Sequence, residues 1–103
     1  MATWTRQLQE QEGTFLFSGL FTCTAHVKAQ LTDDEIHSIY TEIQKAVKEN
    51  NGLDYLQVFI DEEEEERRLF LIDSMNQEAI ESELYDTSDP LVNYYTLMFA
   101  NEY

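Results

Sequence analysis

Basic residues are scarce in this chain, and their scarcity is its most informative feature. Six Lys and Arg stand against 21 Asp and Glu, so the formal net charge is −15 on 103 residues. Proteins that bind phosphate backbones or anionic lipids need clustered Lys and Arg. We therefore expect DNA, RNA and membrane surfaces to repel this protein. The composition instead predicts a positively charged partner.

Residues that build crosslinks, zinc sites and phosphate loops are also few. Cys23 is the sole cysteine, so no disulfide can form within the chain and nothing indicates an oxidising compartment. One Cys and two His cannot supply a zinc site of the usual kind. Three glycines form no phosphate-binding loop. Carboxylate pairs arise by chance among 21 acids, so they identify no catalytic site. We expect no cofactor and no enzymatic activity.

Long hydrophobic runs are missing as well. No stretch reaches about 18 apolar residues, and no basic segment precedes an apolar run as in a signal peptide. We expect an unprocessed cytoplasmic protein. Hydrophobic residues still make up 43% of the chain and aromatic residues 13%, which is too much for a disordered acidic tail. We therefore expect residues 1–103 to form a single acidic domain around one core.

One helix is clearly marked by its ends. Thr32 and Glu35 form a capping-box pattern, and apolar residues recur behind them at helical spacing. Gly52 suits the left-handed residue that ends a helix. The pattern predicts a helix over about residues 33–50.

A second helix is predicted at the C-terminus. Asp89 followed by Pro90 is a typical helix start. Leu91, Tyr95 and Met98 then recur at i, i+4 and i+7. We predict a helix over about residues 90–101 that docks on a sheet.

Strands are indicated by alternation of apolar and polar residues. The alternation over residues 21–28 predicts a strand with Cys23 on its buried face. Residues 55–60 and 69–72 also have the composition of strands, and the simplest connection between them is an antiparallel hairpin. Residues 1–12 suit one or two helical turns. The sequence thus predicts an α+β domain with a small antiparallel sheet of about four strands.

The last third of the chain resembles an uncharacterised family, the domain-of-unknown-function family 3768. In that family an aromatic-rich strand ends in Ile-Asp, an Asp-Pro follows, and the chain closes with a Thr-Leu-hydrophobic stretch and Glu-Tyr. The matching residues are Phe70, Ile72, Asp73, Asp89, Pro90, Thr96, Leu97, Met98, Ala100, Glu102 and Tyr103. The family tends to have Trp-Lys before Ile-Asp, whereas this chain has Phe70-Leu71. The resemblance implies a compact α+β domain and supplies no activity.

The run from Asp61 to Glu66 is the one low-complexity segment. Carboxylates on an extended strand advance by about 3.3 Å per residue, and phosphates on one DNA strand by about 3.4 Å along the axis. Alternate strand residues leave opposite faces, so only half would meet one partner unless the run lies in an irregular loop. The functional interpretation is a mimic of nucleic-acid phosphates. The alternative is a solvated hairpin tip whose charges protect the sheet edge.

The charge is polarised toward the second half of the chain. Residues 61–103 carry 13 acids and 2 bases, a charge of −11, whereas residues 1–60 carry 8 acids and 4 bases, a charge of −4. We expect acids beyond the run to lie near it and to extend one negative surface. The predicted partner-binding residues are Asp61, Glu62, Glu63, Glu64, Glu65, Glu66, Glu78, Glu81, Glu83 and Asp86.

These patterns support one leading hypothesis and two alternatives. The leading hypothesis is an acidic inhibitor that occupies the nucleic-acid site of a basic protein, such as a CRISPR effector or a restriction enzyme. Small size and strong acidity suit an anti-CRISPR or anti-restriction protein of a phage or mobile element. The first alternative is an acidic calcium-binding or calcium-buffering protein, although no EF-hand pattern is present. The second is an interaction module whose charge serves only solubility.

Overall fold

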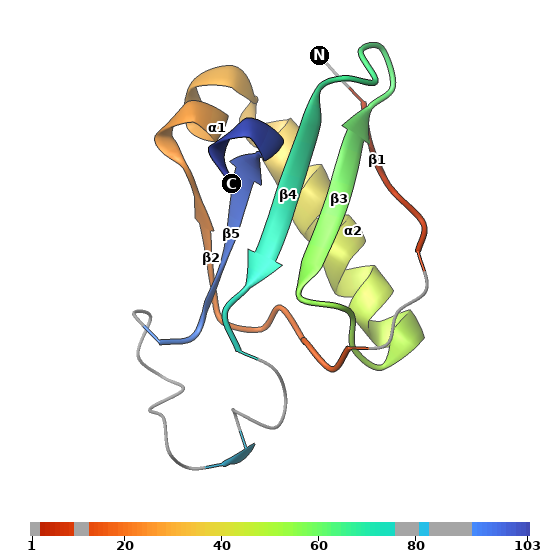
Figure 1. The fold of residues 1–103 in the computed structure, drawn as a ribbon, viewed down its shortest axis with the longest axis vertical. Helices are drawn as coiled ribbons and strands as arrows, with labels where there is room; N and C mark the ends of the chain where they lie inside the picture. The colour runs from red at the N-terminus through yellow and green to blue at the C-terminus, as the bar shows by residue number, and fades with distance from the viewer. Residues whose placement is uncertain (1–2, 10–12, 76–80, 83–91) are drawn as a thin grey trace.

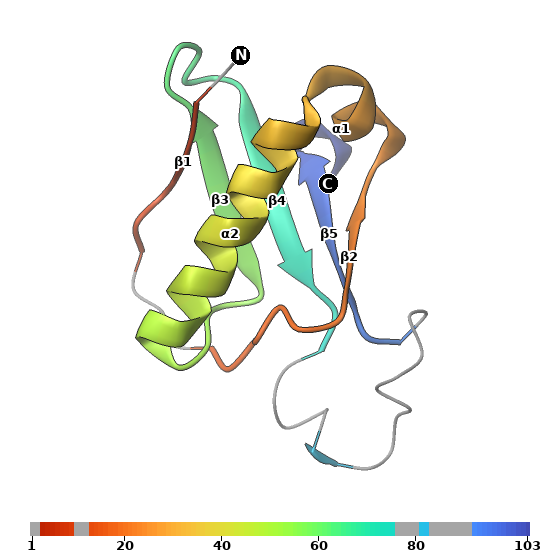
Figure 2. The ribbon, with the colours of Figure 1, turned by 180° about the vertical axis from the view of Figure 1, so that it is seen from behind.

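The computed structural model describes residues 3–9, 13–75, 81–82 and 92–103. It has a five-stranded sheet with one long helix packed across one face (Figures 1 and 2). The predicted α+β class is therefore confirmed. In chain order the elements are β1 (Trp4–Arg6), β2 (Leu20–Cys23), α1 (Ala25–Gln30), α2 (Asp33–Asn50), β3 (Leu56–Asp61), β4 (Arg68–Asp73), β5 (Tyr94–Phe99) and the 3-10 helix η1 (Ala100–Glu102).

The sequence predicts an antiparallel sheet of about four strands, whereas the structure has a mixed sheet of five. Its strand order is β1-β3-β4-β5-β2. The β1–β3, β3–β4 and β4–β5 pairs are antiparallel, whereas β2 and β5 run parallel. The predicted hairpin is confirmed as β3 and β4. Since β2 pairs only with β5 within the described part of the chain, the two edges of the sheet are β1 and β2.

Helix α2 is confirmed over residues 33–50. The Thr32 hydroxyl accepts the Glu35 N–H at 3.2 Å, and the Glu35 carboxylate accepts the Thr32 N–H at 3.1 Å, which completes the capping box. At the other end Asn51 takes the left-handed conformation with φ 55°, followed by Gly52 with φ 117°. Asn tolerates this conformation, so the left-handed residue that ends the helix is Asn51, one residue before the predicted Gly52.

Glu35 also ties β1 to the start of α2. Its carboxylate is buried and accepts the indole N–H of Trp4 at 2.8 Å. Burial acts to raise the pKa of Glu35, but the hydrogen bonds from Thr32 and Trp4 outweigh it and lower the pKa. The three residues of β1 are therefore held by a side chain of α2 as well as by pairing with β3. The predicted helical turns over residues 1–12 are wrong for residues 4–6, which form β1.

The predicted C-terminal helix is wrong, because its central residues form β5. Tyr95, Leu97 and Phe99 are 2%, 0% and 7% exposed, while the residues between them are more exposed, as the two-residue period of a strand requires. Hydrogen bonding to strands on both sides, β4 and β2, satisfies the backbone of β5 without helix formation. The helix start predicted at Asp89 and Pro90 lies outside the described residues.

The strand predicted over residues 21–28 is also shorter than expected. It ends at Cys23, and residues 25–30 form α1. The Thr24 hydroxyl accepts the Val27 N–H at 3.2 Å and so caps the new helix. The strand therefore ends at the capping residue Thr24. The alternation of apolar and polar residues in the sequence continues beyond it only by chance, because those residues are helical.

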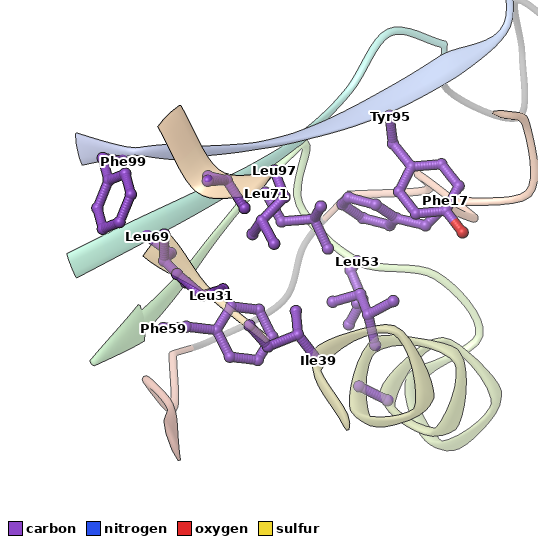
Figure 3. Close-up of a cluster of buried hydrophobic side chains, with 13 residues drawn as sticks. Phe17, Leu31, Ile39, Leu53, Phe59, Leu69, Leu71, Tyr95, Leu97 and Phe99 are labelled. Carbon is purple, nitrogen blue, oxygen red and sulfur yellow. The ribbon is translucent and has the colours of Figure 1, made fainter. Parts of the chain in front are cut away.

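The core lies between α2 and the sheet (Figure 3). Side chains from both layers and from the extended segment before β2 meet there. The fully buried members include Phe17, Val27, Ile43, Leu53, Phe59, Leu69, Leu71 and Leu97. The Tyr95 ring packs edge-on against Phe17 with centroids 5.7 Å apart. Burial raises the pKa of the Tyr95 phenol, whose oxygen accepts a hydrogen bond from Gln44.

A buried carboxylate fixes the chain where it enters this core. Phe17 has φ 47°, an unfavourable conformation for a bulky residue. The buried Asp73 carboxylate, at the end of β4, accepts the Phe17 N–H at 2.9 Å. Burial raises the pKa of Asp73 in spite of this bond. Asp73 therefore has a structural role in the described fold.

Candidate acidic partner interface

The acidic run divides into a buried anchor and an exposed loop. Asp61 is the last residue of β3 and is 2% exposed. Glu62 to Glu66 connect β3 to β4 outside either strand, and all five are exposed. We call residues 62–66 the acidic loop. Since these residues lie outside a strand, their side chains are free of the strict alternation that would send every second carboxylate to the opposite face.

Asp61 holds the acidic loop from inside. Its carboxylate accepts the Glu63 N–H at 2.9 Å and pairs with the Arg67 guanidinium at 3.1 Å. A carboxylate that is buried and satisfied in this way is not presented to a partner. The prediction that Asp61 contacts a partner is therefore corrected: Asp61 is an anchor of the loop.

Arg67 closes the loop at its other end. The Arg67 N–H donates to the Glu64 carbonyl at 2.8 Å, and the Asp61 N–H donates to the Arg67 carbonyl at 3.1 Å. The Arg67 guanidinium carbon lies 5.3 Å from the Trp4 ring centroid and 5.6 Å from that of Phe99, within cation–π range. Arg67 thus neutralises the buried Asp61, and its backbone holds the loop in a tight turn.

The first residue of the loop is tied to β1. The Glu62 N–H donates to the Thr3 carbonyl at 3.0 Å, and the Glu62 carboxylate accepts the Thr5 hydroxyl. The strand register places Trp4 opposite Asp61, directly beside these contacts. Three chain segments therefore define the shape of the loop: β1, the end of β3 and the start of β4.

Replacing Asp61 by Asn is expected to lower the free energy of unfolding by about 1–2 kcal/mol. The change leaves the partly exposed Arg67 charge without its buried counterion, and solvent screening limits the loss. Urea denaturation measures the difference. Glu64→Gln is the matched control, because it removes the same charge from an exposed side chain and should change stability by less than about 0.5 kcal/mol. Equal stability of the two variants would contradict the anchoring role.

Two further acids share the end of the molecule that carries the acidic loop. Asp33 and Asp34 occupy the first turn of α2 and are exposed. In Figure 2 the β3–β4 turn and the start of α2 lie at the same end, and the Trp4–Glu35 hydrogen bond links β1 to the start of α2. These aspartates are not among the predicted partner-binding residues. That they share an end of the molecule with the loop depends on how α2 packs on the sheet, which no local pattern reveals.

Of the other predicted acids, only Glu81 lies among the described residues, and it is distant from the acidic loop. Glu78, Glu83 and Asp86 lie outside the described part of the chain. Glu81 is exposed, but the six residues of β4 carry the chain about 20 Å away from the acidic loop before that segment begins. In Figure 1 the coloured stretch 81–82 lies at the opposite end from the β3–β4 turn. Of the predicted partner-binding acids that the structure describes, only Glu62 to Glu66 thus lie together at an exposed surface.

The remaining reactive side chains have ordinary surroundings. His26 is exposed on α1, with its ring 4.6 Å from that of Phe99 and its Nδ1 3.6 Å from Glu102. Cys23 is half-buried, and burial raises the pKa of its thiol, which disfavours the reactive thiolate. Among residues 3–9, 13–75, 81–82 and 92–103, no three His, Cys, Asp or Glu side chains are grouped to hold a metal ion.

Comparisons with known proteins give no relative. No family model, no curated protein and no solved structure matches the chain. The resemblance to family 3768 therefore stays a prediction. None of the helices in the described part of the chain is long and apolar enough to cross a membrane.

Proposed function

We propose that this protein binds a basic nucleic-acid-binding protein and inhibits it by occupying its phosphate-binding surface. The observation that carries the proposal is the acidic loop: five consecutive exposed glutamates on a turn fixed by Asp61 and Arg67. A CRISPR effector and a restriction enzyme are examples of the proposed target. The protein itself would contact no nucleic acid.

Anchoring of the loop supports a binding role over a solvated tip. A flexible acidic tip would lose conformational freedom on binding, which costs about 0.5–1.5 kcal/mol for each immobilised side chain in addition to backbone ordering. The hydrogen bonds at Asp61, Glu62 and Arg67 already order this backbone in the free protein. The same contacts stabilise the fold, and in addition they fix the loop backbone before a partner arrives. The glutamates can therefore meet a cationic groove with less entropic cost.

Charge also supports the proposal through the kinetics of encounter. A surface of one sign directs a partner of opposite sign and raises its association rate, and it makes binding sensitive to salt. Asp33 and Asp34, exposed at the same end of the molecule, add negative charge there. Lys/Arg grooves that accept closely spaced phosphates offer the complementary pattern. The same groove would accept closely spaced carboxylates.

Capture experiments test this function. The immobilised protein should retain a basic nucleic-acid-binding protein from a lysate at about 0.1 M salt, and should release it at about 1 M salt, where the screening length falls to about 3 Å. The retained protein should also be displaced by added DNA or RNA, because the two ligands would share one site. Its nucleic-acid binding or cleavage should stop when the acidic protein is in excess.

Two results would contradict the proposed function. One is retention that is unchanged at high salt, since an electrostatic interface must weaken there. The other is a captured protein that binds nucleic acid and this chain simultaneously, because the sites would then be separate.

A further inference from the structure

The sheet has a second face, opposite α2. On the side turned to the viewer in Figure 1, η1 is the described helix nearest the strands, and it lies at the end of β5, where it contacts β4. Strand alternation assigns to this side the residues that lie between the buried ones. We call it the outer face; its central members are Leu56, Val58, Ile60, Phe70, Ile72 and Met98.

The outer face is apolar across three strands. Val58 pairs with Phe70, and Phe70 pairs with Met98, so these side chains form one continuous row. Leu20 and Tyr94, paired at the start of β2 and β5, extend it and are 51% and 38% exposed. A sheet with one face in water usually carries polar residues on that face. Strands that are apolar on both faces are typical of a sheet covered on both sides.

The acidic loop borders this apolar surface. Ile60, on the outer face, is two residues from Glu62, and it pairs with Arg68 at the other end of the turn. Arg68 is the one charged strand residue on the outer face within the described part of the chain. Beside Phe70, the 70%-exposed Tyr103 packs edge-on with ring centroids 5.6 Å apart. Apolar area and carboxylates thus form one contiguous surface.

We infer that the outer face binds an amphipathic basic segment of a partner, with apolar side chains on the Val58–Phe70–Met98 row and Lys or Arg toward the acidic loop. This inference rests on the proposed function and names the surface and the partner segment. Charge complementarity selects this occupant. A second copy of the chain would fit the apolar area, but each copy carries a charge of −15, and stacking two copies would bring like charges together.

Recognition of an amphipathic helix divides into two parts. Apolar residues at i, i+3, i+4 and i+7 provide the area that is buried against a flat or grooved surface. The charged residues flanking that stripe provide orientation and rate. A partner that presents only charge would gain orientation and association rate from the flanking charges, but it would bury no apolar area. Peptides that differ in the apolar stripe alone can therefore separate the two.

Three synthetic helical peptides of equal length test the inference by calorimetry. The first carries a Leu stripe with flanking Lys, the second the same Lys with Gln in place of Leu, and the third the Leu stripe with Glu in place of Lys. We expect binding of the first at one peptide per protein, at least about tenfold tighter than the second. The third should not bind, because its charge has the sign of the protein.

Val58→Thr with Met98→Thr is the matching protein variant. Thr keeps strand propensity and removes apolar area from the row, so the variant should fold but lose the tenfold advantage of the Leu peptide. Leu8→Thr is the control, because Leu8 is 84% exposed and lies outside the strands, in a hollow shared with Ser38 and Glu42 of α2, so its loss should leave peptide binding unchanged. Thermal unfolding verifies that both variants are folded.

The possible failures are distinguishable. Equal binding of the Leu and Gln peptides, or an unchanged preference in the double Thr variant, overturns the inference while leaving a charge-driven function intact. A dimer in sedimentation that buries the outer face also overturns it in favour of a second copy. Absence of salt-sensitive binding to either Lys peptide counts against the proposed function itself.

Discussion

Replacing the five glutamates of the acidic loop (Glu62 to Glu66) by glutamine is expected to weaken binding to a basic partner by about 3–5 kcal/mol. Close charge pairs that lose their water on binding contribute about 1 kcal/mol or more each, whereas exposed pairs contribute little. The substitution keeps side-chain size and removes the charge, while an amide N–H2 donor replaces one acceptor oxygen of each carboxylate. Titration of the captured partner against the wild-type and substituted proteins measures the change, and the salt dependence of binding should become shallower.

A pair of matched variants separates the loop from the overall charge. Glu63→Gln with Glu65→Gln removes two charges from the loop, and Glu42→Gln with Glu49→Gln removes two from exposed positions of α2. We expect the loop pair to weaken binding by at least about tenfold more than the helix pair. If the loop variant and the helix variant weaken binding equally, the net charge of the protein drives association and the acidic loop is not a specific contact site.

Replacing Leu97 by Ala is expected to lower the free energy of unfolding by about 3–4 kcal/mol. Leu97 is fully buried at the centre of β5, and truncation of a buried Leu loses transfer free energy and leaves a cavity. Met98→Ala is the neighbouring control. Its side chain lies on the partly exposed outer face, so the loss should be about 1 kcal/mol. Urea denaturation of both variants gives the comparison.

The order of these two losses also discriminates between strand and helix. In the C-terminal helix that the spacing predicts, Met98 belongs to the apolar stripe with Leu91 and Tyr95, and Leu97 does not. A helix would thus make Met98→Ala the more damaging change. A larger loss for Met98→Ala than for Leu97→Ala would contradict β5.

Elements with local signals could be predicted, and those that depend on distant partners could not. The boundaries of α2 are specified within its own sequence by the Thr32–Glu35 capping box and by the turn at its end. The residues of β5 fit both a helical and a strand period, and only its two neighbouring strands decide between them. Strand β1 has three residues and needs β3 and Glu35 to hold it.

The candidate site shows the same division. Exposure of Glu62 to Glu66 follows from their charge and position in a turn. Burial of Asp61 could have been found by extending the alternation of Gln57 and Phe59 by one step, since all three lie on the core side of β3. Pairing of Asp61 with Arg67 then explains why a base follows the acidic run. That Asp33 and Asp34 lie at the same end of the molecule as the loop follows only from the three-dimensional structure.

The position of β5 between β2 and β4 has a consequence for how the chain folds. The hydroxyls of Thr22 and Thr96 meet at 2.8 Å although they are 74 residues apart in sequence, so β2 can join the sheet only after nearly the whole chain has looped back. Closing so long a loop comes at an entropic cost before any contact compensates it. We therefore expect the hairpin of β3 and β4 and the helix α2 to form early, and the β2–β5 pairing to complete the sheet later.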